Sequence, residues 1–137
     1  MITVEELLHH YDLKNTGCRK FILTELLQSE TALSEEEIKR TYPDLFDRVT
    51  FYRTLKTLEE RGIIHRIVLN DNSVKYALNR HHPEANPLHA HFHCGNCDEV
   101  LCLQGKTRFD AELPAGFVTR EVFVLIEGLC ATCNHPS

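Results

Sequence analysis

A run of fourteen residues from His89 to Cys102 holds most of the side chains in this chain that could bind a metal. Histidines occupy the alternate positions His89, His91 and His93, and the thiol Cys102 closes the run. Within it lies the pair Cys94-x-x-Cys97, and a second pair, Cys130-x-x-Cys133, lies near the end of the sequence. A tetrahedral zinc ion needs four soft donors, and two such pairs supply them. We therefore predict a structural zinc site formed by Cys94, Cys97, Cys130 and Cys133.

A disulfide framework is the alternative explanation for paired cysteines. The sequence begins Met-Ile-Thr-Val-Glu-Glu without an apolar secretory segment, which predicts a cytoplasmic protein whose thiols stay reduced. No apolar run approaches the roughly 18 residues of a membrane span, so we expect no membrane association. Cys18 falls on the apolar face of a predicted helix, and we interpret it as a small buried side chain.

The size and charge of the chain limit its architecture. Its 137 residues suit two small domains, each of which needs a metal or a partner chain for stability. The net charge of -5 argues against indiscriminate coating of nucleic acid. Residues 1–80 hold twelve Lys and Arg against thirteen acids, whereas residues 81–137 hold three against seven. Any nucleic-acid surface is therefore expected in the first half.

Four helices are predicted in the first half from the spacing of apolar residues. They cover Val4 to Tyr11, about residues 16–28, a short segment that opens at the capping box of Ser34 and Glu37, and about residues 47–61. The last of them ends at Gly62, a residue suited to the left-handed turn past a helix. Phe51, Leu55 and Leu58 form its buried stripe.

The opposite face of this fourth helix presents Val49, Tyr52, Arg53 and Lys56. Such a cationic and aromatic surface suits a DNA major groove, where Arg reads guanine, Val contacts a thymine methyl and Lys meets phosphate. For the helix alone, an ordinary solvated face is the alternative. The following residues, 63–69 and 73–78 around a turn at 70–72, read as a hairpin. Helices followed by a hairpin indicate a winged helix-turn-helix, assigned to residues 1–79.

The second half reads as a separate α/β domain, residues 89–137. Residues 80–88 contain two prolines and no periodicity, and are predicted to be a hinge. Strands are expected over residues 89–93, 99–103 and 117–127, with a short helix over residues 106–113. Apolar residues occupy both faces of the last strand, which implies that a second copy covers one of them. The predicted fold class is α+β, a winged helix-turn-helix followed by a small dimerisation domain.

Three motifs carry a resemblance to a known family: Val49-Thr-Phe-Tyr-Arg-Thr-Leu-Lys-Thr-Leu-Glu-Glu-Arg-Gly62, the His-x-His-x-x-Cys-x-x-Cys run that ends at Cys97, and Gly128-Leu-Cys-Ala-Thr-Cys133. Over nearly its whole length the chain resembles the ferric uptake regulator family of metal-responsive bacterial repressors. The resemblance implies a homodimer with winged-helix arms, a structural zinc on paired cysteines and a second, switching metal site at the hinge. By position it implies DNA contacts for Lys14 and Arg19. The residues that we predict to bind DNA are Lys14, Arg19, Val49, Thr50, Tyr52, Arg53 and Lys56.

A regulatory metal is predicted at His65, His89, His91 and Cys102. Alternation puts the strand histidines on one face, and Cys102 lies on the next strand. His65 is similar to a ligand of the zinc uptake regulator branch, and His81, His82, His93 and Glu121 are the alternatives.

Two alanines mark departures from the family pattern. Ala90 replaces an acid found in many members, so a thiolate and imidazoles favour Zn²⁺ over Fe²⁺ or Mn²⁺. Ala32 replaces a histidine, and the two replacements together predict that one accessory metal site is absent.

The predicted function is a metal-dependent, zinc- or iron-sensing transcriptional repressor that binds palindromic double-stranded operator DNA as a homodimer, and not an enzyme. A zinc enzyme such as a deaminase is the alternative, because His82-x-Glu84 and Cys94-x-x-Cys97 loosely echo a deaminase zinc site. That signature has Pro where this chain has His93. A peroxide-sensing repressor is an alternative within the family.

Overall fold

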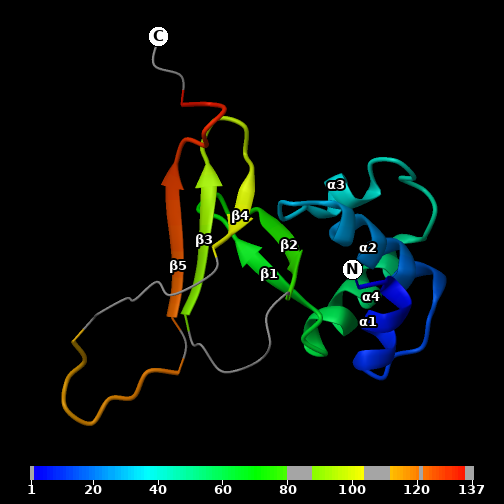
Figure 1. The fold of residues 1–137 in the computed structure, drawn as a ribbon, viewed down its shortest axis with the longest axis horizontal. Helices are drawn as coiled ribbons and strands as arrows, with labels where there is room; N and C mark the ends of the chain where they lie inside the picture. The colour runs from blue at the N-terminus through cyan, green and yellow to red at the C-terminus, as the bar shows by residue number, and fades with distance from the viewer. Residues whose placement is uncertain (1, 80–87, 104–111, 121, 135–137) are drawn as a thin grey trace. The chain divides into compact units, whose positions relative to one another are not determined.

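The computed structural model describes residues 2–79, 88–103, 112–120 and 122–134, which belong to two compact units, Met1–Arg80 and His81–Ser137. Figure 1 shows the helices and one hairpin in the first unit and three further strands in the second. The hinge predicted for residues 80–88 lies outside the described residues except at its last position. None of the described helices is long and apolar enough to span a membrane.

The first unit contains the helices α1 (Val4–His10), α2 (Gly17–Gln28), α3 (Glu35–Lys39) and α4 (Arg48–Glu60). Each begins after a residue whose side chain accepts a backbone N–H of the first turn, which satisfies a donor that the helix leaves unpaired. These caps are Thr3, Thr16, Ser34 and Asp47, and Ser34 forms the predicted capping box with Glu37. After α4 the chain turns at Gly62, whose φ is +79°. The four helices predicted from apolar spacing are confirmed.

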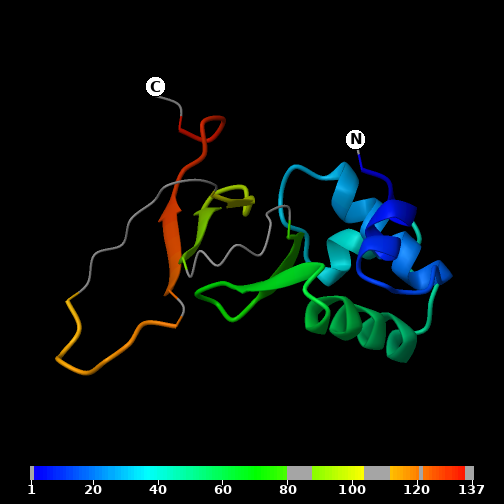
Figure 2. The same cartoon turned by 60° about the horizontal axis from the view of Figure 1, so that its bottom comes forward.

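The core of the first unit lies between the helices and the hairpin that follows them. Ile22 on α2, Ile38 on α3 and Leu58 on α4 are fully buried, and Ile64 at the start of the hairpin packs in the same cluster. Figure 2 shows α4 as a straight helix that leads directly into this hairpin. The apolar stripe of α4 therefore faces inward and leaves its other face exposed.

The hairpin consists of the antiparallel strands β1 (Ile64–Val68) and β2 (Val74–Leu78), as predicted. Its turn contains Asn72 at φ 68°, a conformation that Asn tolerates better than most residues. Lys75 on β2 is buried and pairs with Glu37 on α3 at 3.0 Å. This ion pair and a bridge between Leu33 and Tyr76 tie the hairpin to the α3 region.

The second unit contains a three-stranded sheet of order β4-β3-β5, with β3 (Leu88–Cys94) in the middle (Figure 1). The strand β4 (Val100–Cys102) pairs antiparallel with β3, and β5 (Val122–Gly128) pairs parallel with it. This mixed pairing brings segments more than thirty residues apart in sequence side by side.

The last strand is shorter than the sequence predicts. It was expected over residues 117–127 but begins at Val122, and residues 117–120 are described outside any strand. Its ladder starts with the pair Leu88 and Val122, so β5 begins where its partner β3 begins. The helix expected over residues 106–113 lies outside the described residues apart from its last two positions, which are not helical.

Candidate functional site

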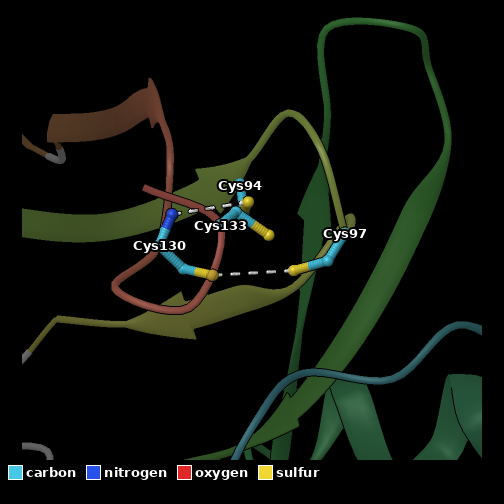
Figure 3. A group of neighbouring side chains, drawn as sticks. All are labelled: Cys94, Cys97, Cys130 and Cys133. Carbon is cyan, nitrogen blue, oxygen red and sulfur yellow. Dashed lines mark hydrogen bonds between the residues drawn. The ribbon is translucent and has the colours of Figure 1, made fainter. Parts of the chain in front are cut away.

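The structure brings the four paired cysteines together. Cys94 ends β3, Cys97 lies on the turn that follows, and Cys130 and Cys133 lie on the turn after β5. Figure 3 shows the four side chains converging from these two turns. Their sulfur atoms all lie within 4.8 Å of one another.

Backbone hydrogen bonds hold the two cysteine turns in place. The N–H of Gly95 donates to the carbonyl of Gly128 at 2.9 Å, and the N–H of Cys130 donates to the Cys94 sulfur at 3.4 Å. A side chain at Gly128 would place its Cβ 3.1 Å from the ring of Phe92, closer than most Cβ contacts. Glycine there lets β5 run close to β3 just before the second turn.

The cysteine cluster stabilises one thiolate readily and resists further ionisation. Backbone N–H groups of Cys97 and Cys130 lower the pKa of Cys94 to about 6. The N–H of Glu99 would by itself lower the pKa of Cys97, but hydrogen bonding with the other three thiols, that of Cys94 most of all, and partial desolvation raise it to about 12. Negative charge placed on one sulfur therefore opposes ionisation of its neighbours unless a cation balances it.

The geometry of the cluster fits a tetrahedral ion. Zn–S bonds of about 2.3 Å in a tetrahedron place neighbouring sulfurs roughly 3.8 Å apart. The Sγ atoms of Cys97 and Cys130, on different turns, are 3.8 Å apart. The Cys94 sulfur is also fully buried, which suits a closed structural site rather than one with an open coordination position. The four cysteines could thus hold one metal ion.

A histidine and a thiol from the predicted regulatory set are neighbours in the sheet. His91 on β3 is 9% exposed and lies opposite Cys102 on β4 in the antiparallel register. His89 belongs to β3, but its side chain lies outside the described residues, as do His81, His82 and Glu121.

His65 is oriented within its own unit. It lies on β1, and its Nδ1 is 2.6 Å from the side-chain oxygen of Asn79. The amide nitrogen of Asn79 donates to the carbonyl of Gly62, which leaves that oxygen to accept from the imidazole. This arrangement favours the tautomer with the proton on Nδ1 and the lone pair on Nε2, as in many metal-binding histidines.

The predicted recognition surface is exposed on α4. Val49 is 58% and Tyr52 is 61% exposed, and Arg53 and Lys56 are exposed beside them. Thr50 is exposed too, with its hydroxyl donating to the carboxylate of Asp47 at 2.8 Å.

The Lys and Arg side chains of the first unit divide into three groups. Lys20, Lys39, Arg66 and Lys75 each pair with a carboxylate. Arg19 and Arg61 donate to backbone carbonyls instead. Among residues 2–79, no ion pair involves the third group, which consists of Lys14, Arg40, Arg48, Arg53 and Lys56. The uncompensated charge lies on the Lys14 loop, at the end of α3 and on α4. Both cations of the hairpin, in contrast, pair with a carboxylate, Lys75 at 3.0 Å and Arg66 at 3.7 Å.

Four exposed residues next to the predicted surface did not emerge from the sequence. Arg40 and Arg48 flank the segment between α3 and α4, and Tyr42 and Leu45 within it are 58% and 54% exposed. Two arginines and two large apolar residues so close to the start of α4 are a signal that sequence reading could have used.

Arg19, for which the resemblance implies a DNA contact, also makes a hydrogen bond within its own unit. Its Nη1 donates to the carbonyl of Lys14 at 3.0 Å, and the same carbonyl accepts the N–H of Thr16. Arg61, after α4, donates to the carbonyls of Tyr11 and Asp12. These bonds fix the loop that carries the exposed Lys14.

Comparison with known proteins gives consistent results. Residues 10–111 match the model of the ferric uptake regulator family. A ferric uptake regulation protein of Campylobacter jejuni is 31% identical over 141 residues, which cover 96% of this chain and 86% of that protein.

Solved structures share the fold. The Helicobacter pylori ferric uptake regulator, described with three functional metal-binding sites, has a TM-score of 0.62 at 20% identity, with 98% of this chain and 96% of that chain covered. A zinc uptake regulator complexed with zinc and DNA has a TM-score of 0.63 at 23% identity, with coverage of 97% and 96%.

Proposed function

Since the chain belongs to the ferric uptake regulator family, we propose that it is a metal-dependent transcriptional repressor that binds palindromic operator DNA as a homodimer. The observation that carries the proposal is the exposed face of α4, where aromatic and apolar side chains lie beside cations that have no acidic partner among residues 2–79. The family consists of metal-responsive regulators and not enzymes, so the deaminase alternative is set aside.

DNA recognition is assigned to α4 within a winged helix-turn-helix. Arg53 reads a base edge in the major groove, Tyr52 and Val49 supply apolar contact, and Lys56 meets phosphate. Lys14 approaches the DNA from its own loop. The hairpin contributes little phosphate binding in this assignment, because its cations Arg66 and Lys75 are already paired with acids.

The four-cysteine cluster is proposed to hold a structural zinc ion. The support is the sulfur spacing, the buried Cys94 and the all-thiolate donor set, which suits zinc better than the harder iron or manganese ions. The ion would balance the thiolate charge and join the turn after β3 to the turn after β5.

The homodimer is proposed to form through β5. This strand is an edge of the described sheet. Phe123 and Ile126 on it are 70% and 42% exposed, and Leu129 directly after it is 54% exposed. An exposed apolar edge strand is prone to pair with another chain. A second copy that covers β5 would bury these side chains.

A regulatory metal, with zinc favoured, is proposed on His89, His91 and Cys102, with His65 from the DNA-binding unit as the shared ligand. The support is the pairing of His91 with Cys102 and the tautomer of His65 set by Asn79. To convert a population from mostly open to mostly closed arms, the ion must bind the closed form about 10⁴-fold more tightly, about 5.5 kcal/mol. A ligand contributed by the other unit can supply that difference.

The function is tested by DNA binding in a metal series. A duplex is selected from a random pool by the zinc-loaded protein, and its fluorescence anisotropy is then titrated with protein that carries only its tightly bound metal. We expect tight binding of an AT-rich inverted repeat on addition of Zn²⁺, weaker enhancement by Fe²⁺ or Mn²⁺, and loss of binding with a chelator. Metal-independent binding, or no duplex selected at all, contradicts the proposal.

The regulatory site is tested by the double variant His89→Ala with Cys102→Ser. It should keep one zinc per subunit and remain dimeric but lose the second metal and the metal dependence of DNA binding. If it retains two metals per subunit and full regulation, the switch lies elsewhere. The variant His9→Ala, which removes an exposed histidine of α1, serves as the control.

A further inference from the structure

One imidazole connects the two halves of the cysteine cluster. The side chain of His93 is 15% exposed and lies between two carboxylates. Its Nδ1 is 2.8 Å and 3.0 Å from the two oxygens of Glu127, and its Nε2 is 2.5 Å from an oxygen of Asp98. Both ring nitrogens are thus engaged by side chains from different parts of the unit.

The partners of His93 lie next to the two cysteine pairs. His93 directly precedes Cys94, and Asp98 directly follows Cys97. Glu127 lies opposite His93 in the parallel β3–β5 ladder, three residues before Cys130. Glu127, His93 and Asp98 therefore form a bridge of hydrogen bonds. It runs from β5, which leads into the Cys130–Cys133 turn, through β3 to the end of the Cys94–Cys97 turn.

This arrangement is unsuited to metal binding by His93 itself. The two ring nitrogens point away from each other across the imidazole, so Glu127 and Asp98 approach from opposite sides and cannot converge with the ring on one ion. Asp98 is also held at φ 68°, with its N–H donating to the carbonyl of Cys94 at 3.0 Å. The turn thus presents the Asp98 carboxylate to the ring rather than to the sulfurs.

We propose that His93 is a positioning residue for the four-cysteine site, which holds the Cys94–Cys97 turn and the strand that leads to Cys130 at the spacing that a tetrahedral ion needs. The inference deepens the structural-zinc assignment above and rests on it. Each turn contributes two of the four thiolates, so loss of the ion requires the two turns to separate. A side chain bonded to both sides opposes that separation and slows release of the metal. Substitution of a residue that orients metal ligands typically lowers metal affinity roughly 10- to 100-fold.

Either carboxylate of the bridge can be removed by a substitution that introduces little backbone strain. Asp98→Gly removes one carboxylate at a position whose positive φ suits glycine, and Glu127→Ala removes the other from an exposed strand position. Zinc-loaded full-length protein is mixed with excess 4-(2-pyridylazo)resorcinol at one pH, and the rate of zinc release is read from the absorbance of its zinc complex.

We expect each single variant to release zinc roughly 10-fold faster or more, and the double variant to be no faster than the faster single one, because one cut already breaks the bridge. Asp98→Asn and Glu127→Gln keep hydrogen-bonding side chains at both ends and should release zinc near the wild-type rate. Glu112→Ala, which removes an exposed acid elsewhere in the unit, is the matched control for lost charge.

Four outcomes are decisive against the inference, and the last of them also overturns the assignment on which it rests. Wild-type rates in both cut variants mean that the bridge does not retain the metal. If the double variant releases zinc faster by the product of the two single effects, the two carboxylates act independently and not through His93. Fast release in Asp98→Asn and Glu127→Gln means that charge, not the bridge, is responsible. A wild-type protein that takes up no zinc overturns the structural-zinc assignment itself, and this inference with it.

Discussion

The two units of this chain bury apolar surface to very different degrees. The core cluster of the first unit runs from Val4 to Leu78 and includes residues from all four helices and both hairpin strands. In the described part of the second unit the buried apolar residues are Ala90, Cys94 and Val100, whereas Phe123 and Val118 are 70% and 84% exposed. A small unit with so little core needs a metal or a partner chain, so the stability of the two units should depend on different things.

The largest expected effect comes from removing a thiolate. Cys97→Ser leaves three cysteines around the ion, and because a closed zinc site contributes folding free energy directly, the second unit should loosen and the dimer dissociate. Zinc content and solution mass measure the effect. The helical circular dichroism should persist, because all described helices lie in the first unit.

The matched control is Cys18→Ala, which removes a buried cysteine of the first unit. It should retain full zinc and remain dimeric. A Cys97→Ser protein that stays dimeric with one zinc per subunit would show that the second unit does not depend on the ion.

Shortening a buried side chain of the first unit should have the opposite effect, with lower stability of that unit and unchanged zinc content. Leu58 is fully buried, so Leu58→Ala should lower the free energy of unfolding of the first unit by about 2–5 kcal/mol while zinc content stays unchanged. Leu129→Ala makes the same chemical change at an exposed position of the second unit and should leave the helical unfolding transition in place while weakening the dimer. Equal shifts of that transition in both variants would mean that the two units do not depend on different sources of stability.

DNA binding should be confined to the first unit. Arg53→Ala should cost about 1–3 kcal/mol of binding free energy and relax base preference, with zinc content and mass unchanged. Arg66→Ala removes an equal charge that is already paired with Glu59, and should cost less. Lys14→Ala should weaken binding to all sequences and flatten its salt dependence. If Arg53→Ala binds DNA with wild-type affinity, the assignment of α4 as the recognition helix is wrong.

The smallest effect concerns an acid-sensitive contact in the first unit. Partial burial alone would raise the pKa of Glu37, but hydrogen bonds from the Ser34 backbone and from the Lys75 ammonium lower it overall. A lowered pKa means that the stabilisation is present above the unfolded value, about 4.3, and is lost as the pH falls through the folded one.

Glu37→Gln should therefore cost about 1–2 kcal/mol of unfolding free energy at pH 7, because it replaces the carboxylate that pairs with buried Lys75 by a neutral amide. The difference from wild type should shrink below about pH 4, where wild-type Glu37 is protonated too. Chemical denaturation from pH 7 to pH 3 measures it. A difference that does not change with pH would mean that the charge of Glu37 contributes nothing.

Local chemistry made most of the first unit predictable. The Thr16 cap of α2, the capping box of Ser34 and Glu37, and the end of α4 at Gly62 could be predicted. Each depends only on residues a few positions away in the sequence. The order of helices followed by a hairpin came from periodicity in the same way. The grouping of the four cysteines was predictable from ligand count and spacing rather than from fold.

Long-range pairing decided what the sequence could not. The sequence by itself determined the helices, the caps of α2 and α3, the hairpin and the four candidate zinc ligands, since those signals are local or are counts of donor atoms. Only the tertiary structure placed β5 parallel to β3, and with it Glu127 beside His93 and a later start for the strand. It also decided which cations are neutralised, as in Lys75 with Glu37, and which remain available on α4. The physical reason is that strand order and register join residues more than thirty positions apart, and no local pattern encodes them.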